Sequence, residues 1–374
     1  MTRRTGSHAE PERILVRCPN WLGDVVMTTP GLRALRQSFP EARIVAQLPE
    51  ALIPVLEGSG LCDELWPVAP RGASLSTLAR ESRRMADMQF DLGIVVPESI
   101  SSALRMRLGR VRRVVGFARD PIRRALLGEV VPAPASWGRR RLVSRERFGL
   151  RLMEAVGAAG DSCRLSLSVT EAEDARLESA LRSHGLSLAA LESDRLIVLA
   201  PGAGFGPAKC WPAESYAALG DRFAKKVGRV VLVGSAADAS SLDAVHAAMK
   251  STPILLGASL DLGALKALLC RARLLVSNDA GARHVAAAFD VPSVVFFGPT
   301  SVAKTPENLD AIEILESDHD CRPCYRRECP IDHRCLRSIG VEAAEAAAGR
   351  ALERDHRFPD TPRAAAAFVT GAIA

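Results

Sequence analysis

The feature that most constrains this chain is a repeated alternation of short apolar runs with segments of helical spacing. Runs such as Ile14–Arg17 and IVLA (197–200) are each followed by a turn and then by an amphipathic segment. Parallel strands covered by helices on both faces read as nearly continuous apolar runs, so the alternation predicts an α/β fold. The series occurs twice in 374 residues, which predicts two doubly wound domains facing a cleft.

These patterns also set the expected segments. Residues 1–12 are polar and lack the apolar core of a secretion signal, so we expect a mobile tail on a cytoplasmic protein. The first domain is expected over 13–165 and the second over 166–340, with an alanine-rich helical segment over 341–374. Thr170 is predicted to cap a helix, because its hydroxyl can accept from a backbone N–H of the first turn.

Individual elements follow from the same periodicity. No apolar run approaches the roughly 18 residues of a membrane-spanning helix. In the first domain, strands are expected at 14–17, 42–49, 91–99 and 112–118, with helices through 32–36, 52–60 and 144–157. In the second domain, we expect strands at 195–200, 229–233, 253–257, 274–278 and 291–297. We expect helices between them at 212–226, 240–250, 261–272 and 282–290.

Arginine is concentrated in one part of the first domain. Between Ser101 and Arg151 there are 14 arginines and three acidic residues, a local charge of +11, whereas the remaining chain carries −5. Such asymmetry suggests an anionic partner, and the alternative is a solvated arginine-rich surface. Only 5% of residues are aromatic and no nucleic-acid motif is present, so nucleic acid is not an expected partner.

Four glycine-containing turns follow strands of the second domain. Ligands of such sheets bind beyond the carboxyl ends of the strands, where glycines and helix N-termini offer backbone N–H groups to phosphate. The four turns together favour a nucleotide diphosphate site, although none matches a P-loop, a dinucleotide-binding fingerprint or a nucleophile elbow. They are PGAGFGPAK (201–209), GSAAD (234–238), SNDAG (277–281) and FGPT (297–300).

Individual side chains in these turns have alternative interpretations. Asn278 or Asp279 is predicted to cap the following helix, and His284 can donate a hydrogen bond to an anion. The alternative is that Asp279 only caps and His284 is a packed surface residue. Lys209 either faces phosphate or is an exposed loop lysine. In PNWLGDVVMTTP (19–30), Asp24 follows the first strand and is either a helix cap or a general base.

Nine cysteines are present, and four form a cluster with the spacing C-x2-C-x4-C-x5-C. Four thiolates can hold zinc tetrahedrally, and the arginines in this loop favour thiolate formation, so a structural zinc ion is one interpretation. Reduced structural thiols and one local disulfide are the alternatives. The clustered residues are Cys321, Cys324, Cys329 and Cys335, whereas Cys18, Cys62, Cys163, Cys210 and Cys270 are expected to be buried thiols.

Four segments resemble the lipopolysaccharide heptosyltransferases of glycosyltransferase family 9, specifically the heptosyltransferase II type. The resemblance runs from about Arg13 to about Arg337 and implies the GT-B fold of two Rossmann-like domains. It implies an inverting transfer of L-glycero-D-manno-heptose from ADP-heptose to the inner core of lipopolysaccharide, with no cofactor required for catalysis. The segments are PNWLGDVVMTTPGLRALR (19–36), PGAGFGPAKCWP (201–212), SNDAGARHVAAAFDVPSVVFFGPT (277–300) and CRPCYRRECPIDHRC (321–335).

The resemblance also implies roles for particular residues. Asp24 is implied to be the general base, Lys209 a donor-phosphate contact, and Gly281 a backbone contact to phosphate. Asp279 and His284 are implied to lie at the ADP. The remaining implied substrate-binding residues are Gly23, Ala280, Gly298 and Thr300.

The implied partners are the ADP-heptose donor and an anionic lipid A-linked oligosaccharide (lipid A-Kdo-heptose). The arginine-rich stretch 105–147 would bind this acceptor, with the enzyme peripheral on the inner face of the cytoplasmic membrane. The chain departs from the family at Ala280, where the family usually has Ser or Thr, so one hydroxyl contact is lost. A related transferase using another nucleotide sugar and a GT-B-like sugar-nucleotide epimerase are the alternatives.

Overall fold

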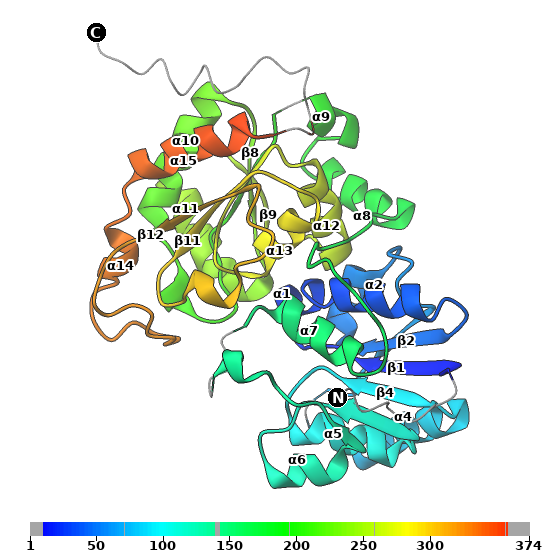
Figure 1. The fold of residues 1–374 in the computed structure, drawn as a ribbon. Coiled ribbons are helices and arrows are strands. Elements are labelled where there is room, and N and C mark those ends of the chain that lie inside the picture. Colours follow the sequence, from blue (N-terminus) through cyan, green and yellow to red (C-terminus); the bar gives the residue numbers. More distant parts are fainter. Residues whose placement is uncertain are drawn as a thin grey trace. The chain divides into compact units, whose positions relative to one another are not determined.

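The computed structural model describes residues 10–70, 72–138, 143–193, 195–257, 259–355 and 357. The chain forms two compact units, Met1–Cys163 and Arg164–Ala374, which divide just before the boundary expected after residue 165. Each unit contains a six-stranded parallel sheet with helices on both faces (Figure 1). The predicted α/β class with two doubly wound sheets is therefore confirmed.

The first sheet consists of β1 (Arg13–Arg17), β2 (Arg43–Leu48), β3 (Glu64–Pro67), β4 (Leu92–Val95), β5 (Arg113–Gly116) and β6 (Glu129–Val130). Its order is β3-β2-β1-β4-β5-β6, and all neighbouring pairs are parallel. The order reverses between β1 and β4, and ligands of such sheets bind at the carboxyl ends of strands there. β3 and β6 were not expected, because they are short and mostly half-buried, which leaves no continuous apolar run.

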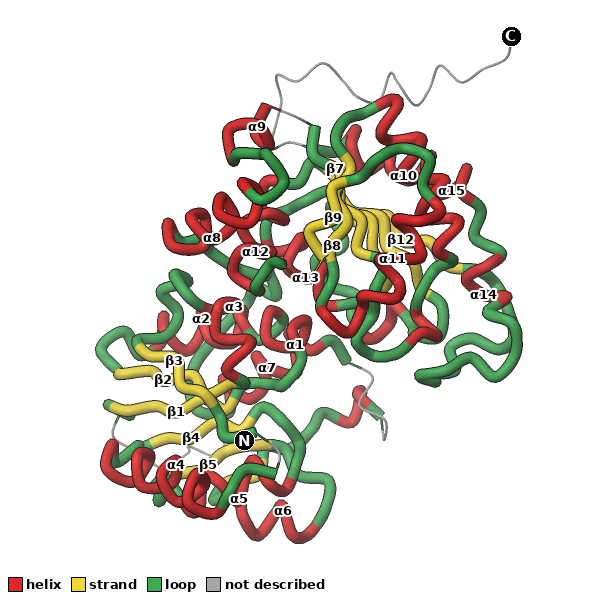
Figure 2. Tube along the Cα trace, turned by 180° about the vertical axis from the view of Figure 1, so that it is seen from behind, coloured by secondary structure: helices red, strands yellow, loops and turns green. Residues whose placement is uncertain are grey.

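Helices cover both faces of the first sheet (Figure 2). They are α1 (Leu22–Val26), α2 (Thr29–Ser38), α3 (Ile53–Leu56), α4 (Leu75–Met88), α5 (Ile100–Leu108), α6 (Pro121–Leu126) and α7 (Arg145–Glu154). Figures 1 and 2 show α1, α2, α3 and α7 on one face and α4, α5 and α6 on the other. The helix expected over 52–60 is only the single turn α3, because Gly58 and Gly60 adopt the left-handed conformation that ends it.

The expected mobile tail ends earlier than residue 12. The Glu12 carbonyl oxygen accepts from the Arg43 N–H at 2.8 Å, and the Glu12 N–H donates to Asp91 Oδ2 at 3.1 Å. Glu12 is therefore fixed to the first sheet, and the expectation is wrong for this residue. Residues 1–9 of the expected tail lie outside the described residues.

The second sheet consists of β7 (Ile197–Ala200), β8 (Val230–Val233), β9 (Ile254–Gly257), β10 (Leu274–Asn278), β11 (Ser293–Phe297) and β12 (Ile312–Glu316). Its order, β12-β11-β10-β7-β8-β9, repeats the topology of the first sheet in sequence, with parallel pairing throughout. The reversal lies between β7 and β10. The five expected strands are confirmed, whereas β12 was missed because its residues are only partly buried.

The helices of the second unit are α8 (Glu171–Arg182), α9 (Leu188–Ser193), α10 (Ala213–Lys226), α11 (Ala239–Ala248), α12 (Leu262–Arg271), α13 (Gly281–Ala288), α14 (Arg334–Arg337) and α15 (Val341–Glu353). The cap at Thr170 is confirmed, and Glu173 completes a reciprocal capping box with it. Within the described ranges, no helix has both the length and the apolar character needed to cross a bilayer.

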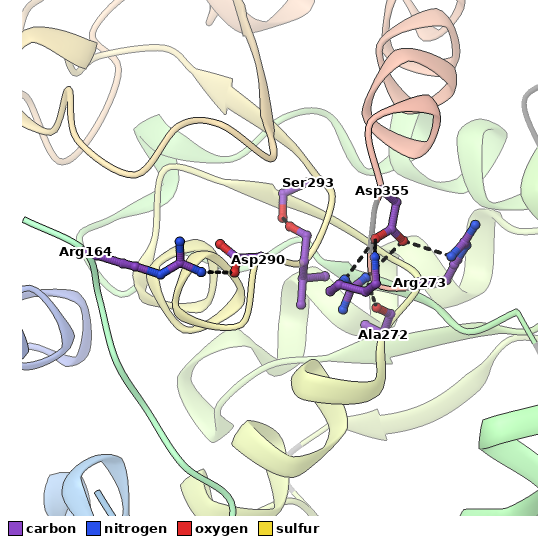
Figure 3. A network of polar contacts seen from close by, with 8 residues as sticks. Arg164, Ala272, Arg273, Asp290, Ser293 and Asp355 are labelled. Atoms are coloured by element: carbon purple, nitrogen blue, oxygen red, sulfur yellow. Dashed lines mark hydrogen bonds and ion pairs between the residues drawn. The ribbon is translucent and has the colours of Figure 1, made fainter. Parts of the chain in front are cut away.

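The segment expected over 341–374 begins as an integral part of the second unit. Helix α15 packs against α10, β11 and β12. After it, the buried Asp355 carboxylate accepts from Arg273 Nη1 at 2.9 Å and from Arg357 Nε at 3.1 Å, as Figure 3 shows around the labelled Arg273 and Asp355. Residues 356 and 358–374 lie outside the described residues.

Candidate functional site

A buried polar cluster lies at the carboxyl ends of β7 and β10, the strands at which the second sheet reverses its order. Lys209 ends a short 3-10 helix (Pro207–Lys209) that follows β7, and Asp279 follows β10 directly. The Lys209 ammonium donates to both the carbonyl oxygen and Oδ2 of Asp279, each at 2.7 Å. Because its side chain is only 13% exposed, Lys209 is not an exposed loop lysine.

Two further side chains donate hydrogen bonds to the Asp279 carboxylate. Arg283 Nε donates to its Oδ1 at 2.9 Å, and the Thr300 hydroxyl donates to its Oδ2 at 2.7 Å. Burial raises the pKa of Asp279, but the charges of Arg283 and Lys209 outweigh burial and hold that pKa well below its usual range. Asp279 is therefore an anion whose charge is more than balanced by two cations.

The cluster has the properties of an anion-binding site. An ammonium group has three N–H donors, and Asp279 takes two of those of Lys209. Ala280 is the N-cap of α13 and makes no side-chain cap, so backbone N–H groups of the first turn, beginning at Gly281, remain available. Excess positive charge at a helix N-terminus favours a bound phosphate. The negative charge of Asp279 is offset by Lys209 and Arg283, so the cluster as a whole does not repel a phosphate.

His284 lies in the same region and is buried. The residue is 6% exposed, so the interpretation as a surface histidine is wrong. Burial, reinforced by the charge of Arg283, lowers the pKa of His284 well below its ordinary value. No other described residue hydrogen-bonds its imidazole. The ring is therefore neutral near pH 7 and has one N–H to donate.

Asn278 fixes the glycine turn that carries Lys209. Its amide donates to the carbonyl oxygens of Pro201 at 2.7 Å and Gly202 at 3.2 Å. Its Oδ1 accepts from the Trp211 backbone N–H at 3.0 Å and from the Tyr216 hydroxyl at 3.1 Å. All its hydrogen-bonding capacity is thus used across β7 and β10. The predicted capping of α13 by Asn278 or Asp279 is wrong, because both side chains have these other partners.

Gly298 and Thr300 follow β11, and Thr300 joins the cluster through its hydroxyl, whereas Gly298 contacts Arg322. The Arg322 Nε donates to the Gly298 carbonyl oxygen at 2.7 Å. A side chain at Gly298 would meet Leu336 at 2.7 Å, so glycine is required there for packing. Sequence reasoning missed Arg322, which it counted only as a basic loop residue, and Arg283, which was detectable from its position four residues after Asp279.

Asp24 lies in α1, at the carboxyl end of β1 where the first sheet reverses its order. Trp21 is the N-cap of α1 and Asp24 is the third helical residue, so the helix-cap interpretation is wrong. Its side chain is 29% exposed, and Arg145 Nε lies 3.8 Å from Oδ1. Gly23 is buried beside it in the same turn. The structure thus presents a carboxylate and a guanidinium together at this edge.

The arginine-rich stretch is not one free basic surface. Arg123 is buried and donates to the Phe117 carbonyl oxygen at 2.6 Å. Exposed arginines with no acidic partner among the described residues are Arg107, Arg110 and Arg124. Residues 139–142, which include Arg139, Arg140 and Arg141, lie outside the described residues. Ion pairs join Arg105 to Glu81, Arg112 to Asp91, Arg113 to Glu129, Arg119 to Glu98 and Arg151 to Glu154.

The clustered cysteines do not form a metal-ligand set. All four are free thiols, so the local disulfide is absent, and only Cys335 is buried. The described residues include the whole of this loop, and nowhere among them do three His, Cys, Asp or Glu side chains meet at ligand spacing. The zinc interpretation has no support from this geometry and stays a prediction for elemental analysis.

The scattered cysteines only partly follow the expectation. Cys18 is buried, and burial raises the pKa of its thiol to about 12. Cys62, Cys163, Cys210 and Cys270 are only partly buried.

Comparison with known proteins identifies the family. The model of glycosyltransferase family 9 (heptosyltransferase) matches residues 78–334, which is more than half of the chain. Lipopolysaccharide heptosyltransferase 2 of Salmonella typhimurium is 30% identical over 303 residues, covering 79% of this chain and 85% of that protein.

Solved structures agree with this result. A family 9 glycosyltransferase from Veillonella parvula is 25% identical, with a TM-score of 0.79 over 92% of this chain and 98% of that chain. E. coli ADP-heptose LPS heptosyltransferase II is 24% identical, with a TM-score of 0.75 over 91% of this chain and 99% of that chain. These similarities show a two-domain GT-B fold. The chain belongs to glycosyltransferase family 9, the heptosyltransferases, and is most similar to their second type.

Proposed function

We propose that this enzyme transfers L-glycero-D-manno-heptose from ADP-heptose to the inner core of lipopolysaccharide, with inversion and with lipid A-Kdo-heptose as acceptor. The observation that carries the donor assignment is the net positive cluster of Lys209, Asp279 and Arg283 beside the uncapped end of α13. Family membership supplies the reaction class. The names of the Salmonella and E. coli relatives support lipopolysaccharide and ADP-heptose as substrates.

In the proposed complex, the donor diphosphate lies against the third N–H of Lys209 and the backbone N–H groups of Ala280 and Gly281. Neutral His284 donates one further hydrogen bond. Negative charge grows on the diphosphate as the bond from the anomeric carbon to the ADP oxygen breaks. Donors that are already oriented stabilise this charge without reorganising during the reaction.

Asp24 is the proposed general base. The acceptor hydroxyl attacks the anomeric carbon from the face opposite ADP, which inverts that centre, and Asp24 takes the hydroxyl proton. A positioned base of this kind contributes about 10²–10⁴-fold to the rate. Arg145, 3.8 Å from the Asp24 carboxylate, is proposed to hold an anionic group of the acceptor near the base.

The proposed reaction needs no metal ion, because Lys209 and Arg283 supply the excess positive charge at the diphosphate. Transfer should therefore persist after exhaustive dialysis against EDTA. The measurement is ADP release with the acceptor present, with and without chelator. Loss of transfer that added divalent cation restores would contradict this part of the proposal.

The proposed location is the cytoplasm, at the inner face of the cytoplasmic membrane. The lipid-linked acceptor lies in a bilayer, so an enzyme acting on it must reach that surface. Fractionation of cells that express the chain should find part of it with inner membranes, released by high salt because exposed charges are screened beyond about 8–10 Å at physiological ionic strength.

A thermal-shift comparison of ADP, UDP and GDP, followed by product analysis, tests the donor. ADP at 100 times its dissociation constant should stabilise the protein by about 2.7 kcal/mol, and UDP and GDP should not. ADP should then be released from ADP-heptose only with acceptor lipid present. The second candidate, a transferase of another nucleotide sugar, is favoured by Ala280, which lacks the family's hydroxyl. Stabilisation by UDP or GDP instead of ADP would support that candidate.

A further inference from the structure

Helices α5 and α6 present apolar side chains to solvent on the face of the first sheet that they cover together with α4. The two helices contact each other and lie side by side in Figures 1 and 2. Ile100, Leu104 and Leu108 recur at four-residue spacing, which aligns them along one side of α5. They are 40%, 41% and 57% exposed, and Ile122 on α6 is 63% exposed. Four exposed apolar side chains on two contacting helices indicate an interaction surface, whereas a single exposed leucine does not.

The same two helices are cationic. Neither α5 nor α6 contains an acidic residue. Arg107 on α5, Arg124 on α6 and Arg110, two residues after α5, are exposed, and the described part of the chain offers them no acidic partner. We define the α5–α6 face as these three arginines together with the apolar side chains Ile100, Leu104, Leu108 and Ile122.

This combination matches the surface of an anionic bilayer. Apolar side chains of an interfacial helix enter the boundary between headgroups and acyl chains, and its basic side chains bind lipid phosphates. We propose that the α5–α6 face docks the enzyme onto a bilayer of anionic phospholipid. The inference rests on the proposed function, which places the enzyme at a membrane surface, and it names the part of the first unit that binds the bilayer.

The position of the face within the first unit fits this use. Helix α5 follows β4 and α6 follows β5, so both helices begin at the edge of the sheet where the parallel strands end. Asp24, after β1, lies at this same edge. A bilayer held by the α5–α6 face would therefore keep a lipid-linked acceptor in the neighbourhood of the proposed base.

Sedimentation of the full chain with vesicles tests the proposal. The probes are neutral phosphatidylcholine vesicles and vesicles in which part of the lipid is phosphatidylglycerol. Replacing Arg107, Arg110 and Arg124 together by Gln should weaken binding to anionic vesicles by on the order of 100-fold and reduce its salt dependence. Replacing the four apolar residues by Ser should weaken binding about tenfold or more, at low salt as well.

Two controls make the test specific. Ile331→Ser removes an exposed apolar side chain of the second unit, and Arg182→Gln removes an exposed arginine there, so both should leave vesicle binding unchanged. All variants should keep the wild-type melting temperature, and the variant of the four apolar residues should also keep the wild-type rate with a delipidated, water-soluble acceptor.

Several outcomes would overturn the proposal. The first is equal vesicle binding by the wild type and the face variants, and the second is no binding of the wild type to anionic vesicles. The third is lost activity of the apolar-residue variant on the soluble acceptor. Self-association that disappears in the face variants, without vesicle binding, would identify a second copy of the chain as the occupant. Failure of transfer with every acceptor would refute the proposed function and leave the vesicle result standing.

Discussion

At the scale of single residues, Asp24 carries the clearest prediction. Asp24→Asn keeps the size of the side chain, and the N-cap of α1 is Trp21, so the variant should melt like the wild type. It removes the basicity, so turnover should fall by about 10²-fold or more while ADP affinity is unchanged. Steady-state rates and calorimetric ADP titration check this, with Glu41→Gln as an exposed carboxylate control. Turnover within a few-fold of wild type would remove Asp24 from the base role.

Arg283 should set the charge of the donor site. Arg283→Met leaves Asp279 with only Lys209 as a cationic partner, so the cluster loses its net positive charge. ADP affinity should fall by about tenfold or more, since a hydrogen bond or ion pair with a charged group contributes about 1.5–3 kcal/mol. Arg283→Lys should recover part of the loss in a calorimetric titration. Unchanged ADP affinity in a folded Arg283→Met variant would restrict this residue to a packing role.

The buried His284 should make the free energy of unfolding depend on pH. Its pKa is lowered in the folded protein, whereas the unfolded chain takes up the proton near the ordinary value of 6.5. The unfolded state therefore binds more protons below about pH 6.5, and stability falls as the pH falls. Between pH 7.5 and about pH 5.5 this single group should cost at most about 1.4 kcal/mol of stability.

Denaturant unfolding at pH 7.5 and about pH 5.5 measures this loss. His284→Gln should flatten the dependence by the same amount, and His184→Gln, at an exposed position, should not. Equal slopes in all three proteins would show that folding does not lower the pKa of His284.

At the scale of elements, a buried ion pair joins α8 to α12. Lys266 Nζ lies 2.9 Å from the Glu173 carboxylate, and both side chains are almost fully buried. Lys266→Met should destabilise the protein by about 3–5 kcal/mol, because it removes the nearest cation from a buried carboxylate and leaves only Arg176, 4.0 Å away. Adding Glu173→Gln should recover part of this loss, and chemical unfolding of the two variants checks it. If the Lys266→Met variant were as stable as the wild type, Glu173 would have to be protonated or in contact with water.

The sequence indicated some elements better than others. Strands such as β7 and β10 are recognised because all their residues are buried and apolar. The capping box at Thr170 is equally local. The helices α4, α5 and α6 were missed, since α4 has only one buried residue and α5 and α6 expose apolar side chains. Helical spacing is hard to recognise when the apolar face is incomplete or turned outward.

At the scale of the whole molecule, the proposed ADP site involves one unit only. Hydrogen exchange with saturating ADP should slow in segments 201–211, 279–288 and 298–300 of the second unit. Exchange in the first unit, including α1, should stay unchanged. Mass spectrometry of the exchanged peptides measures both. Protection found only in the first unit would contradict the assignment of the donor to the second sheet.

The sequence by itself determined the α/β class, the two series of elements and the turns that carry Lys209 and Asp279. These features depend on local periodicity and on residues close together along the chain. Only the tertiary structure decided that Asp279 binds Lys209, which precedes it by 70 positions, instead of capping α13. Parallel strands that are distant in sequence are neighbours in this sheet, and burial there makes charged side chains pair with one another rather than with water.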